Sequence, residues 1–232
     1  MIHSAPPRSN GTSRWTVFCD FDGTISVDDV TDRLMATFGM SGWQALEQRW
    51  ENGEIGSQRC MSGQIALLDA SRLQLESCLD DIAIDPHFLT FVQRAHAHRI
   101  PLYIVSDGLD YAIDYLLRKH HIPDIPILAN HLQQVSERRW SLTFPCYDQQ
   151  CSQASGTCKC ALARRLAPQK LLMIGDGRSD FCVAAQADHV LAKSSLIERC
   201  EKAAIPFTSF SDFSQAWTCL EQLITPLTEA PC

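Results

Sequence analysis

Two aspartates separated by one residue, Asp20 and Asp22, follow an apolar run from Trp15 to Cys19 that has the composition of a β-strand. Residues i and i+2 of a strand point to the same side, so both carboxylates should leave the strand end in one direction. Two like charges this close raise each other's proton affinity unless a cation lies between them. The pair alone is equally consistent with an acidic turn, because Asp and the following Gly23 are common turn residues.

Two later apolar runs also end in polar residues. These are Ser106 and Asp107 after residues 102–105, and Asp176 and Asp180 after residues 171–174. Apolar runs without polar alternation are typical of strands that are buried on both faces of a parallel sheet. Each polar segment alone could be a turn or a helix cap. Three such segments favour a common pocket, because ligands of doubly wound sheets bind outside the carboxyl ends of the strands.

Together these strand ends would place up to four negative charges in one pocket, which favours a hard divalent cation with oxygen ligands, typically Mg²⁺. The Ser106 hydroxyl and neighbouring backbone N–H groups could hold an anionic oxygen, and Lys159 could neutralise a second one. A phosphoryl group fits this set, because its transfer depends on positioning and charge neutralisation. A carboxylate would then act as the nucleophile, and Asp22 would protonate the leaving oxygen and later activate water.

The periodicity of apolar residues along the chain predicts the strands and helices that position these polar residues. Strands that alternate with helical segments predict an α/β protein with a doubly wound, mainly parallel sheet. Four amphipathic helical patterns and no convincing strand lie between residues 27 and 85, which predicts an inserted helical-bundle cap. We therefore expect a flexible N-terminal tail at 1–14, a catalytic core formed by 15–26 and 86–232, and a cap at 27–85.

The composition disfavours several classes of protein. The 232 residues carry a net charge of −7, from 27 acidic and 20 basic side chains, which argues against a large nucleic-acid-binding face. No apolar run approaches the roughly 18 residues of a membrane-spanning helix, and the polar N-terminus lacks the apolar segment of a signal peptide. We expect a cytoplasmic protein that acts on a small-molecule phosphate ester, without nucleic acid or membrane partners. The sequence leaves the oligomeric state open, and a homodimer is one option.

Four segments of the chain resemble the motifs of haloacid dehalogenase (HAD) superfamily phosphatases. They are FCDFDGTIS, VSDG, the loop lysine and GDGRSD, and the resemblance extends over about residues 15–215. It implies that Asp20 is the nucleophile and that Asp22 is the general acid and base. The implied metal residues are Asp20, Asp22 through its backbone carbonyl, Asp176 and, as a ligand or a support behind the ligands, Asp180. The implied phosphate-binding residues are Gly23, Thr24, Ser106, Asp107 and Lys159.

The insertion at 27–85 lies where phosphoserine-phosphatase-like members of the superfamily carry a helical cap. The segment DVTDRLMATFG, the SDG motif and the cysteine-rich lysine loop resemble most the methionine-salvage 2-hydroxy-3-keto-5-methylthiopentenyl-1-phosphate phosphatases. Asp107 is a departure, because those enzymes commonly have Gly there. Asp29, Arg49 and Arg59 are candidates for contact with the substrate from the cap. Asp29 could instead stabilise a helix N-terminus, and the two arginines could be solvated surface residues.

Several alternatives to this function remain open from the sequence. A phosphoserine phosphatase, a phosphotransferase and a phosphomutase would use the same aspartyl phosphate. A phospho-accepting signalling module is more remote, because Asp22 would hasten loss of the phosphate. A non-catalytic, zinc-binding interaction protein is the most remote alternative.

Cysteines surround the loop lysine. Cys146, Cys151, Cys158 and Cys160 could form a zinc site, but their spacing is not that of the usual short-spaced pairs. Packing of the loop or a redox-sensitive clasp are the other interpretations.

Overall fold

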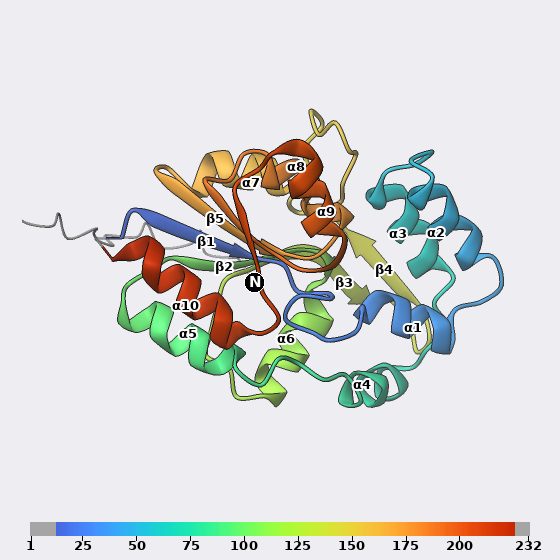
Figure 1. Ribbon diagram of the computed structural model, residues 1–232. Helices are drawn as coiled ribbons and strands as arrows, with labels where there is room; N and C mark the ends of the chain where they lie inside the picture. Colours follow the sequence, from blue (N-terminus) through green and yellow to red (C-terminus); the bar gives the residue numbers. More distant parts are fainter. Residues whose placement is uncertain (1–12, 226–232) are drawn as a thin grey trace, which may run out of the picture.

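The computed structural model describes residues 13–225 (Figure 1), so residues 1–12 of the predicted N-terminal tail lie outside the described residues. Seven strands form one sheet in the order β4-β3-β2-β1-β5-β6-β7. Every neighbouring pair is parallel except β3 and β4, which are antiparallel. The strands are β1 (Trp15–Cys19), β2 (Leu102–Leu109), β3 (Ile127–Gln134), β4 (Trp140–Thr143), β5 (Lys170–Gly175), β6 (His189–Ala192) and β7 (Phe207–Ser209). The predicted doubly wound α/β fold is confirmed.

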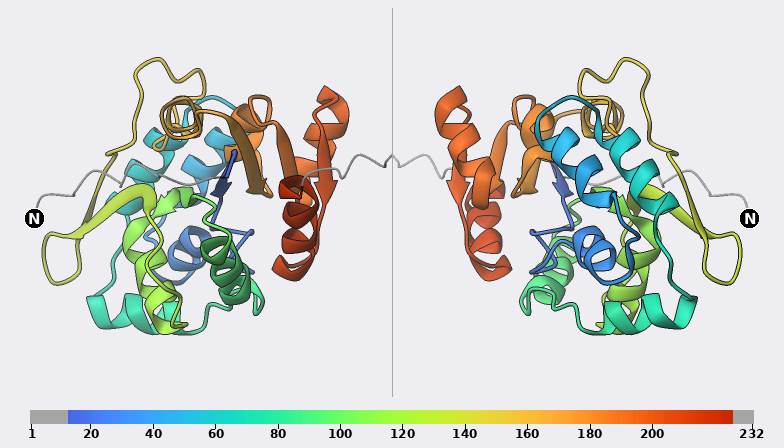
Figure 2. Two further views of the ribbon diagram at one scale, coloured as in Figure 1. Left: turned by 90° about the vertical axis from the view of Figure 1, so that its left-hand side faces the viewer. Right: turned by 90° about the vertical axis from the view of Figure 1, so that its right-hand side faces the viewer.

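Helices cover both faces of the sheet. One face packs against α5 (Phe88–Ala97), α6 (Asp110–Lys119) and α10 (Phe213–Ile224), and the other against α7 (Lys159–Leu166), α8 (Phe181–Ala184) and α9 (Ser194–Ala203). Figure 2 shows β3 and β4 in yellow-green at one edge of the sheet and the orange strands at the other. None of the helices in residues 13–225 is long and apolar enough to cross a lipid bilayer.

The two hydrophobic layers follow from the alternation of side chains along the strands. Val17 and Cys19 belong to the core under α5 and α10, whereas Phe18 belongs to the core under α7 to α9. All three are fully buried, as expected for a central strand of a parallel sheet. Cys19 is in register with Ile104 of β2 and with Ile174 of β5. The polar residues that come after these three aligned positions therefore lie side by side at one edge of the sheet.

Residues 27–83 form a helical insertion that begins and ends at one point of the core. Ser26 and Ile84 pair as an isolated antiparallel bridge, and the Asp85 N–H donates to the Ile25 carbonyl at 2.8 Å. In Figure 1 the insertion lies beyond the carboxyl end of β1, which is the edge that carries the polar motifs. Its helices are α1 (Val30–Phe38), α2 (Trp43–Glu51), α3 (Ser57–Ala66) and α4 (Arg72–Asp80). The four predicted helices are thus present, while their action as a separate cap domain stays a prediction.

Candidate active site

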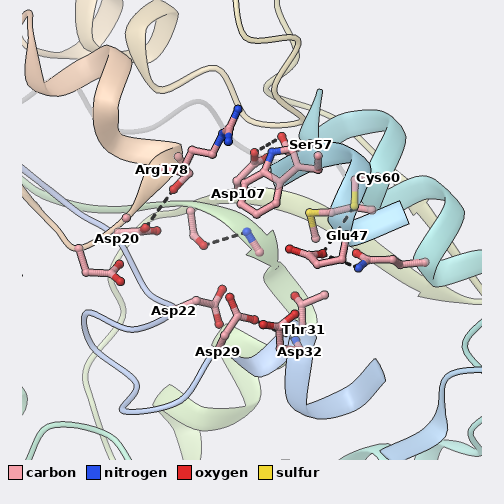
Figure 3. Close-up of a pocket in the computed structure, with 18 residues that line it drawn as sticks. Asp20, Asp22, Asp29, Thr31, Asp32, Glu47, Ser57, Cys60, Asp107 and Arg178 are labelled. Atoms are coloured by element: carbon pink, nitrogen blue, oxygen red, sulfur yellow. Dashed lines mark hydrogen bonds between the residues drawn. The ribbon is translucent and has the colours of Figure 1, made fainter. Parts of the chain in front are cut away.

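A cavity of about 160 Å³ opens between the carboxyl ends of β1, β2 and β5 and helices α1 to α3 (Figure 3). Its lining joins all three polar strand ends to the helical insertion. The lining residues that the sequence analysis named are Asp20, Asp22, Asp29, Ser106, Asp107 and Asp176. Those that it missed include Thr31, Asp32, Glu47, Trp50, Ser57, Cys60, Met61, Gln64, Arg178 and Ser179.

Asp20 lies at the floor of this cavity and is held by donors on both carboxylate oxygens. Its Oδ1 accepts a hydrogen bond from the Phe21 N–H at 2.8 Å and lies 2.9 Å from Nζ of Lys159. Its Oδ2 accepts from the Ser179 hydroxyl at 3.3 Å. The side chain is nearly buried yet lines the cavity, so it is fixed in direction and still accessible to a small molecule.

Three carboxylates meet at this point. Oxygens of Asp20, Asp176 and Asp180 all lie within 4.8 Å of one another. Burial and the neighbouring Asp20 raise the pKa of Asp176 to about 6 and that of Asp180 to about 7. Such crowding is unfavourable without a cation, and the donors are all oxygens, which suits a hard divalent ion such as Mg²⁺.

The oxygens of Asp180 are already engaged by the protein. Oδ1 lies 2.6 Å from Nζ of Lys159, and Oδ2 accepts from the N–H groups of Asp176 and Gly177 at 3.1 and 3.3 Å. Asp176 is only partly buried, and its Oδ1 accepts from the Thr24 hydroxyl at 3.2 Å. Asp180 is therefore better placed to orient Asp176 and Lys159, and Asp176 is better placed to hold a cation.

Lys159 begins α7 and is buried beneath the carboxylates. Burial alone would lower its pKa, but Asp180 and Asp20 outweigh this effect, so the pKa of Lys159 is raised. The ammonium group is charged at neutral pH and also donates to the Ser179 hydroxyl at 3.2 Å. It thereby compensates part of the negative charge of the site.

Asp22 points into the cavity from the turn after β1 (Figure 3). Its Oδ1 accepts from the N–H of Val30, the first residue of α1, at 2.9 Å. Burial, followed by the charge of Asp29, raises the pKa of Asp22 well above its usual value. A carboxyl group whose affinity for a proton is raised in this way is better suited to donate that proton to a leaving group than an ordinary carboxyl group is.

Gly108 leaves room for Asp22. A Cβ atom on Gly108 would lie 2.2 Å from Oδ2 of Asp22, which is far inside van der Waals contact. We therefore expect Gly108→Ala to displace Asp22 and to lower kcat by about a hundredfold, since an error of about 1 Å can cost this much. Steady-state kinetics would measure the change in kcat, and thermal unfolding would measure any change in stability.

Gly63→Ala is the matched control for this change. Its added Cβ would meet only the flexible end of Leu46, at 2.6 Å, within the helical insertion. We expect it to leave kcat close to that of the unmodified protein. Equal kcat values for the two variants would contradict the steric role of Gly108.

Ser106 and its neighbours form the second strand end of the site. The buried Ser106 hydroxyl accepts from the Gly108 N–H at 2.9 Å and lines the cavity. Asp107 also lines the cavity, but its carboxylate accepts from Ser57, Asn130 and Thr157. Gly23 has a φ of +70° and lies directly against the Asp176 carboxylate, where a Cβ would approach Oδ2 to 2.6 Å. Of the predicted phosphate-binding residues, Ser106 and Asp107 thus line the cavity. Gly23 and Thr24 lie against Asp176, and Lys159 lies against Asp20. Their roles stay predictions.

The three substrate candidates of the insertion do not share one location. Asp29 lines the cavity, and burial and Asp32 raise its pKa to about 6. It also caps α1, with its side chain accepting from the Asp32 N–H at 2.9 Å. Arg49 and Arg59 do not line the cavity: Arg49 is paired with Glu54 at the surface, and Arg59 is exposed. The structure therefore corrects the prediction that these two arginines reach the substrate.

Arg178 is the cation that the sequence analysis missed. Among the lining residues of the cavity it is the one with a positive charge. Its guanidinium lies over the Trp50 ring at 5.6 Å, and Nη1 donates to the Glu51 carbonyl at 2.5 Å. The signal was its position inside GDGRSD, two residues after Asp176.

The cysteines of the lysine loop do not assemble a zinc site. Within residues 13–225, the acidic trio is the one group of three or more His, Cys, Asp or Glu side chains close enough to share a metal ion. Cys158 and Cys160 are buried, and Cys146 and Cys151 are partly buried. The Cys158 N–H donates to the Cys146 carbonyl at 2.9 Å. These positions agree with packing of the loop, and the redox-sensitive clasp stays a prediction.

Comparison with known proteins agrees with this geometry. A model of the haloacid dehalogenase-like hydrolase family matches residues 17–185. The chain belongs to this family. The predicted resemblance is confirmed, and with it the prediction that the protein is an enzyme.

Curated relatives of this HAD hydrolase include two phosphatases of the same name. The 2-hydroxy-3-keto-5-methylthiopentenyl-1-phosphate phosphatase of Brevibacillus brevis is 30% identical over 217 residues, which cover 91% of this chain and 97% of the relative. The protein of the same name from Geobacillus kaustophilus is 31% identical over 220 residues, covering 91% and 98% of the two chains.

Solved structures with the same fold include phosphoserine phosphatases. A phospho-aspartyl intermediate analogue of phosphoserine phosphatase has a TM-score of 0.69 at 14% identity, and the match covers 93% of this chain and all (100%) of that one. An HAD family hydrolase from Salmonella enterica serovar Typhi has a TM-score of 0.69 at 17% identity, covering 95% and 74%. At these identities the similarity concerns the fold.

Proposed function

We propose that this HAD hydrolase is a Mg²⁺-dependent phosphatase that cleaves a small phosphate monoester through an aspartyl phosphate on Asp20. The observation that carries the proposal is that Asp20, Asp22, Ser106 and Asp176 line one cavity at adjacent strand ends, with the buried Lys159 in contact with Asp20. Nucleophile, proton donor, oxyanion holders and cation site are the groups that phosphoryl transfer requires. The helical insertion at 27–85 would act as the cap, and 15–26 with 86–232 as the core.

The proposed reaction has two steps. In the first, an Asp20 oxygen bonds to phosphorus while the bond to the ester oxygen breaks, and Asp22 gives its proton to the departing oxygen. In the second, the Asp22 carboxylate takes a proton from a water whose oxygen attacks phosphorus, which releases inorganic phosphate and restores Asp20. Ser106 and Lys159 would hold the non-bridging oxygens throughout.

A divalent cation fits the acidic trio of Asp20, Asp176 and Asp180, because the donors are all oxygens and the pKa values of Asp176 and Asp180 are raised. Asp20, Asp176 and the backbone carbonyl of Asp22 would hold Mg²⁺, which would neutralise charge on the phosphoryl group. Asp180 would orient this set through its contacts with the Asp176 N–H and Lys159.

The substrate that we favour is 2-hydroxy-3-keto-5-methylthiopentenyl-1-phosphate, the compound in the names of the relatives. The wall formed by α1 and α2 supports this choice over phosphoserine. Asp29, Asp32 and Glu47 line it, and burial raises the pKa of each. The α-carboxylate of phosphoserine would be repelled by this acidic wall, whereas neutral hydroxyl and keto groups would not be repelled. Trp50 and Met61 add an apolar surface that suits a methylthio group.

The test is release of inorganic phosphate from a set of esters with Mg²⁺ present. We expect kcat/KM for the methylthio enol phosphate to exceed that for phosphoserine by about a hundredfold, because like charges in contact cost several kcal/mol. We expect a chelator to abolish release and added Mg²⁺ to restore it. Glu47→Gln removes one carboxylate from the wall, so it should reduce the difference in kcat/KM between the methylthio enol phosphate and phosphoserine.

The outcomes separate the parts of the proposal. No release from any ester would contradict the phosphatase function. Faster release from phosphoserine would contradict only the substrate, and transfer of phosphate to a second organic molecule would identify a phosphotransferase or mutase. A phosphorylated protein that persists for hours would instead favour the signalling module. The position of Asp22, which lines the same cavity as Asp20, argues against that module.

A further inference from the structure

Asp107 makes bonds that a phosphate-binding residue would not make. Its Oδ1 accepts from the Thr157 N–H at 2.8 Å and from Nδ2 of Asn130 at 3.2 Å, and its other oxygen accepts from the Ser57 hydroxyl. Nδ2 of Asn130 also donates to the Asp107 carbonyl at 2.6 Å. Both carboxylate oxygens are thus acceptors of hydrogen bonds from the protein, so the side chain offers no donor that could hold a phosphate oxygen. We name Asp107, Ser57, Asn130 and Thr157 the Asp107 joint.

Ser57 connects the joint to the helical insertion. It is the first residue of α3, and its Oγ accepts from the Gly156 N–H at 3.2 Å while its hydroxyl donates to Asp107. The next residue, Gln58, donates its N–H to the Ala154 carbonyl at 3.3 Å. The N-terminal turn of α3 therefore rests on the loop that precedes Lys159.

Thr157 connects the joint to that lysine. Its N–H donates to Asp107, and its hydroxyl donates to Oδ1 of Asn130 at 3.1 Å. Thr157 and Asn130 are almost completely buried, at 1% and 0% exposure. Because Thr157 is two residues before Lys159, the bonds of Thr157 fix the point from which α7 starts. A fully satisfied buried network of this kind specifies one arrangement of the segments that it joins.

We propose that Asp107 is a positioning residue whose carboxylate locks the N-terminal turn of α3 and the loop before Lys159 onto the strand end that carries Ser106. This inference rests on the proposed function, since it makes closure of the insertion over the cavity and placement of Lys159 depend on each other. When α3 is seated, Ser57 fills the last acceptor position of Asp107 and covers the cavity. When α3 moves away, that oxygen and the Gly156 N–H both lose a partner, so an open insertion leaves the lysine loop less ordered.

The test combines amide hydrogen exchange with kinetics on Asp107→Ala, Asp107→Asn and Ser57→Ala. We expect Asp107→Ala to speed exchange of the Thr157 amide, and Ser57→Ala that of Gly156, by at least about tenfold, because each loses its acceptor. In both variants kcat should fall, and the inhibition constant of inorganic phosphate should rise, by at least about tenfold. In Asp107→Asn, kcat and the inhibition constant of phosphate should stay within about threefold of those of the unmodified protein. The reason is that Oδ1 of the new Asn can still accept from Thr157, and the Ser57 hydroxyl can accept from the new amide.

Two controls have the same chemistry at other places. Asp85→Ala removes a buried carboxylate that accepts from the N–H groups of His87 and Phe213, and Ser71→Ala removes the hydroxyl that caps α4. We expect both to lower the midpoint of thermal unfolding and to leave kcat and the phosphate inhibition constant unchanged.

Three results would overturn the proposal. The first is an unchanged exchange rate of the Thr157 amide in Asp107→Ala. The second is a lower stability of that variant with unchanged kcat and an unchanged inhibition constant of phosphate. The third is a fall in kcat in Asp107→Asn that is as large as in Asp107→Ala. Tighter phosphate binding by Asp107→Ala would show that the carboxylate faces the phosphate instead. The exchange measurement needs no substrate, so it tests the joint independently of the phosphatase function.

Discussion

Asp20→Asn is expected to reduce kcat by about four orders of magnitude or more, as loss of a catalytic nucleophile does in other enzymes. The amide has nearly the shape of the carboxylate, but its oxygen is far too weak a nucleophile to attack phosphorus. Lys159 keeps its partner Asp180 at 2.6 Å, so the buried ammonium is not left alone. Phosphate release in a single-turnover experiment is the measurement, because it reports the first chemical step.

The fold of Asp20→Asn should survive unchanged or slightly stabilised. The charge of Asp20 raises the pKa of both Asp176 and Asp180, so its removal relieves repulsion among the three acids in the absence of a cation. The midpoint of thermal unfolding in a chelator should therefore not fall. Asp212→Asn is the matched control, since Asp212 is the half-buried N-cap of α10 and Asn is an equally good cap. Turnover by Asp20→Asn equal to that of the control would contradict the role of Asp20 as nucleophile.

Lys159→Met is expected to damage both stability and activity. The change leaves Asp20 and Asp180 buried without the cation that lies 2.9 and 2.6 Å from them. Removing one partner of a buried ion pair typically costs about 3–5 kcal/mol, because an uncompensated charge remains. Loss of a charge that stabilises the transferred group lowers kcat by a further factor of about 10²–10³. Chemical denaturation without Mg²⁺ and kinetics with saturating Mg²⁺ measure the two effects.

Lys202→Met provides the comparison for this change. Lys202 pairs with Glu198 one helical turn away on the exposed face of α9, where such pairs contribute about 0.5 kcal/mol or less. We expect its stability and activity to match those of the unmodified protein. If Lys159→Met behaved like Lys202→Met, Lys159 would be neither the partner of the acids nor a phosphate holder.

The sequence was sufficient to predict the framework of the site. Three apolar runs, each followed by polar residues, predict buried parallel strands, and the carboxyl ends of such strands meet at one edge. Asp20, Ser106 and Asp176 are brought together in this way. The insertion was also predictable, because the apolar positions of residues 27–85 repeat with the period of a helix and not with that of a strand.

One helix and one edge strand escaped the same reasoning. The helix α9 and the strand β7 were not predicted, and β7 has only three residues, from Phe207 to Ser209. A segment this short shows no periodicity, and its pairing with β6 is what makes it a strand. Arg49 and Arg59 failed for a related reason. The side of a helix that faces a cavity depends on how the helix packs, and a list of charged residues does not contain this information.

The sequence by itself was sufficient to predict the central strands β1, β2 and β5 and the polar residues at their carboxyl ends. A phosphoryl-transfer site was therefore the best interpretation. The tertiary structure alone decided which side chains meet across the fold. Asp107 looks like part of a phosphate-binding turn in the sequence, yet its partners Ser57 and Thr157 are each 50 residues away. Lys159 likewise contacts Asp20 only because the fold packs the start of α7 against the end of β1. Periodicity reports local burial, whereas hydrogen bonds and ion pairs between distant segments depend on packing in three dimensions.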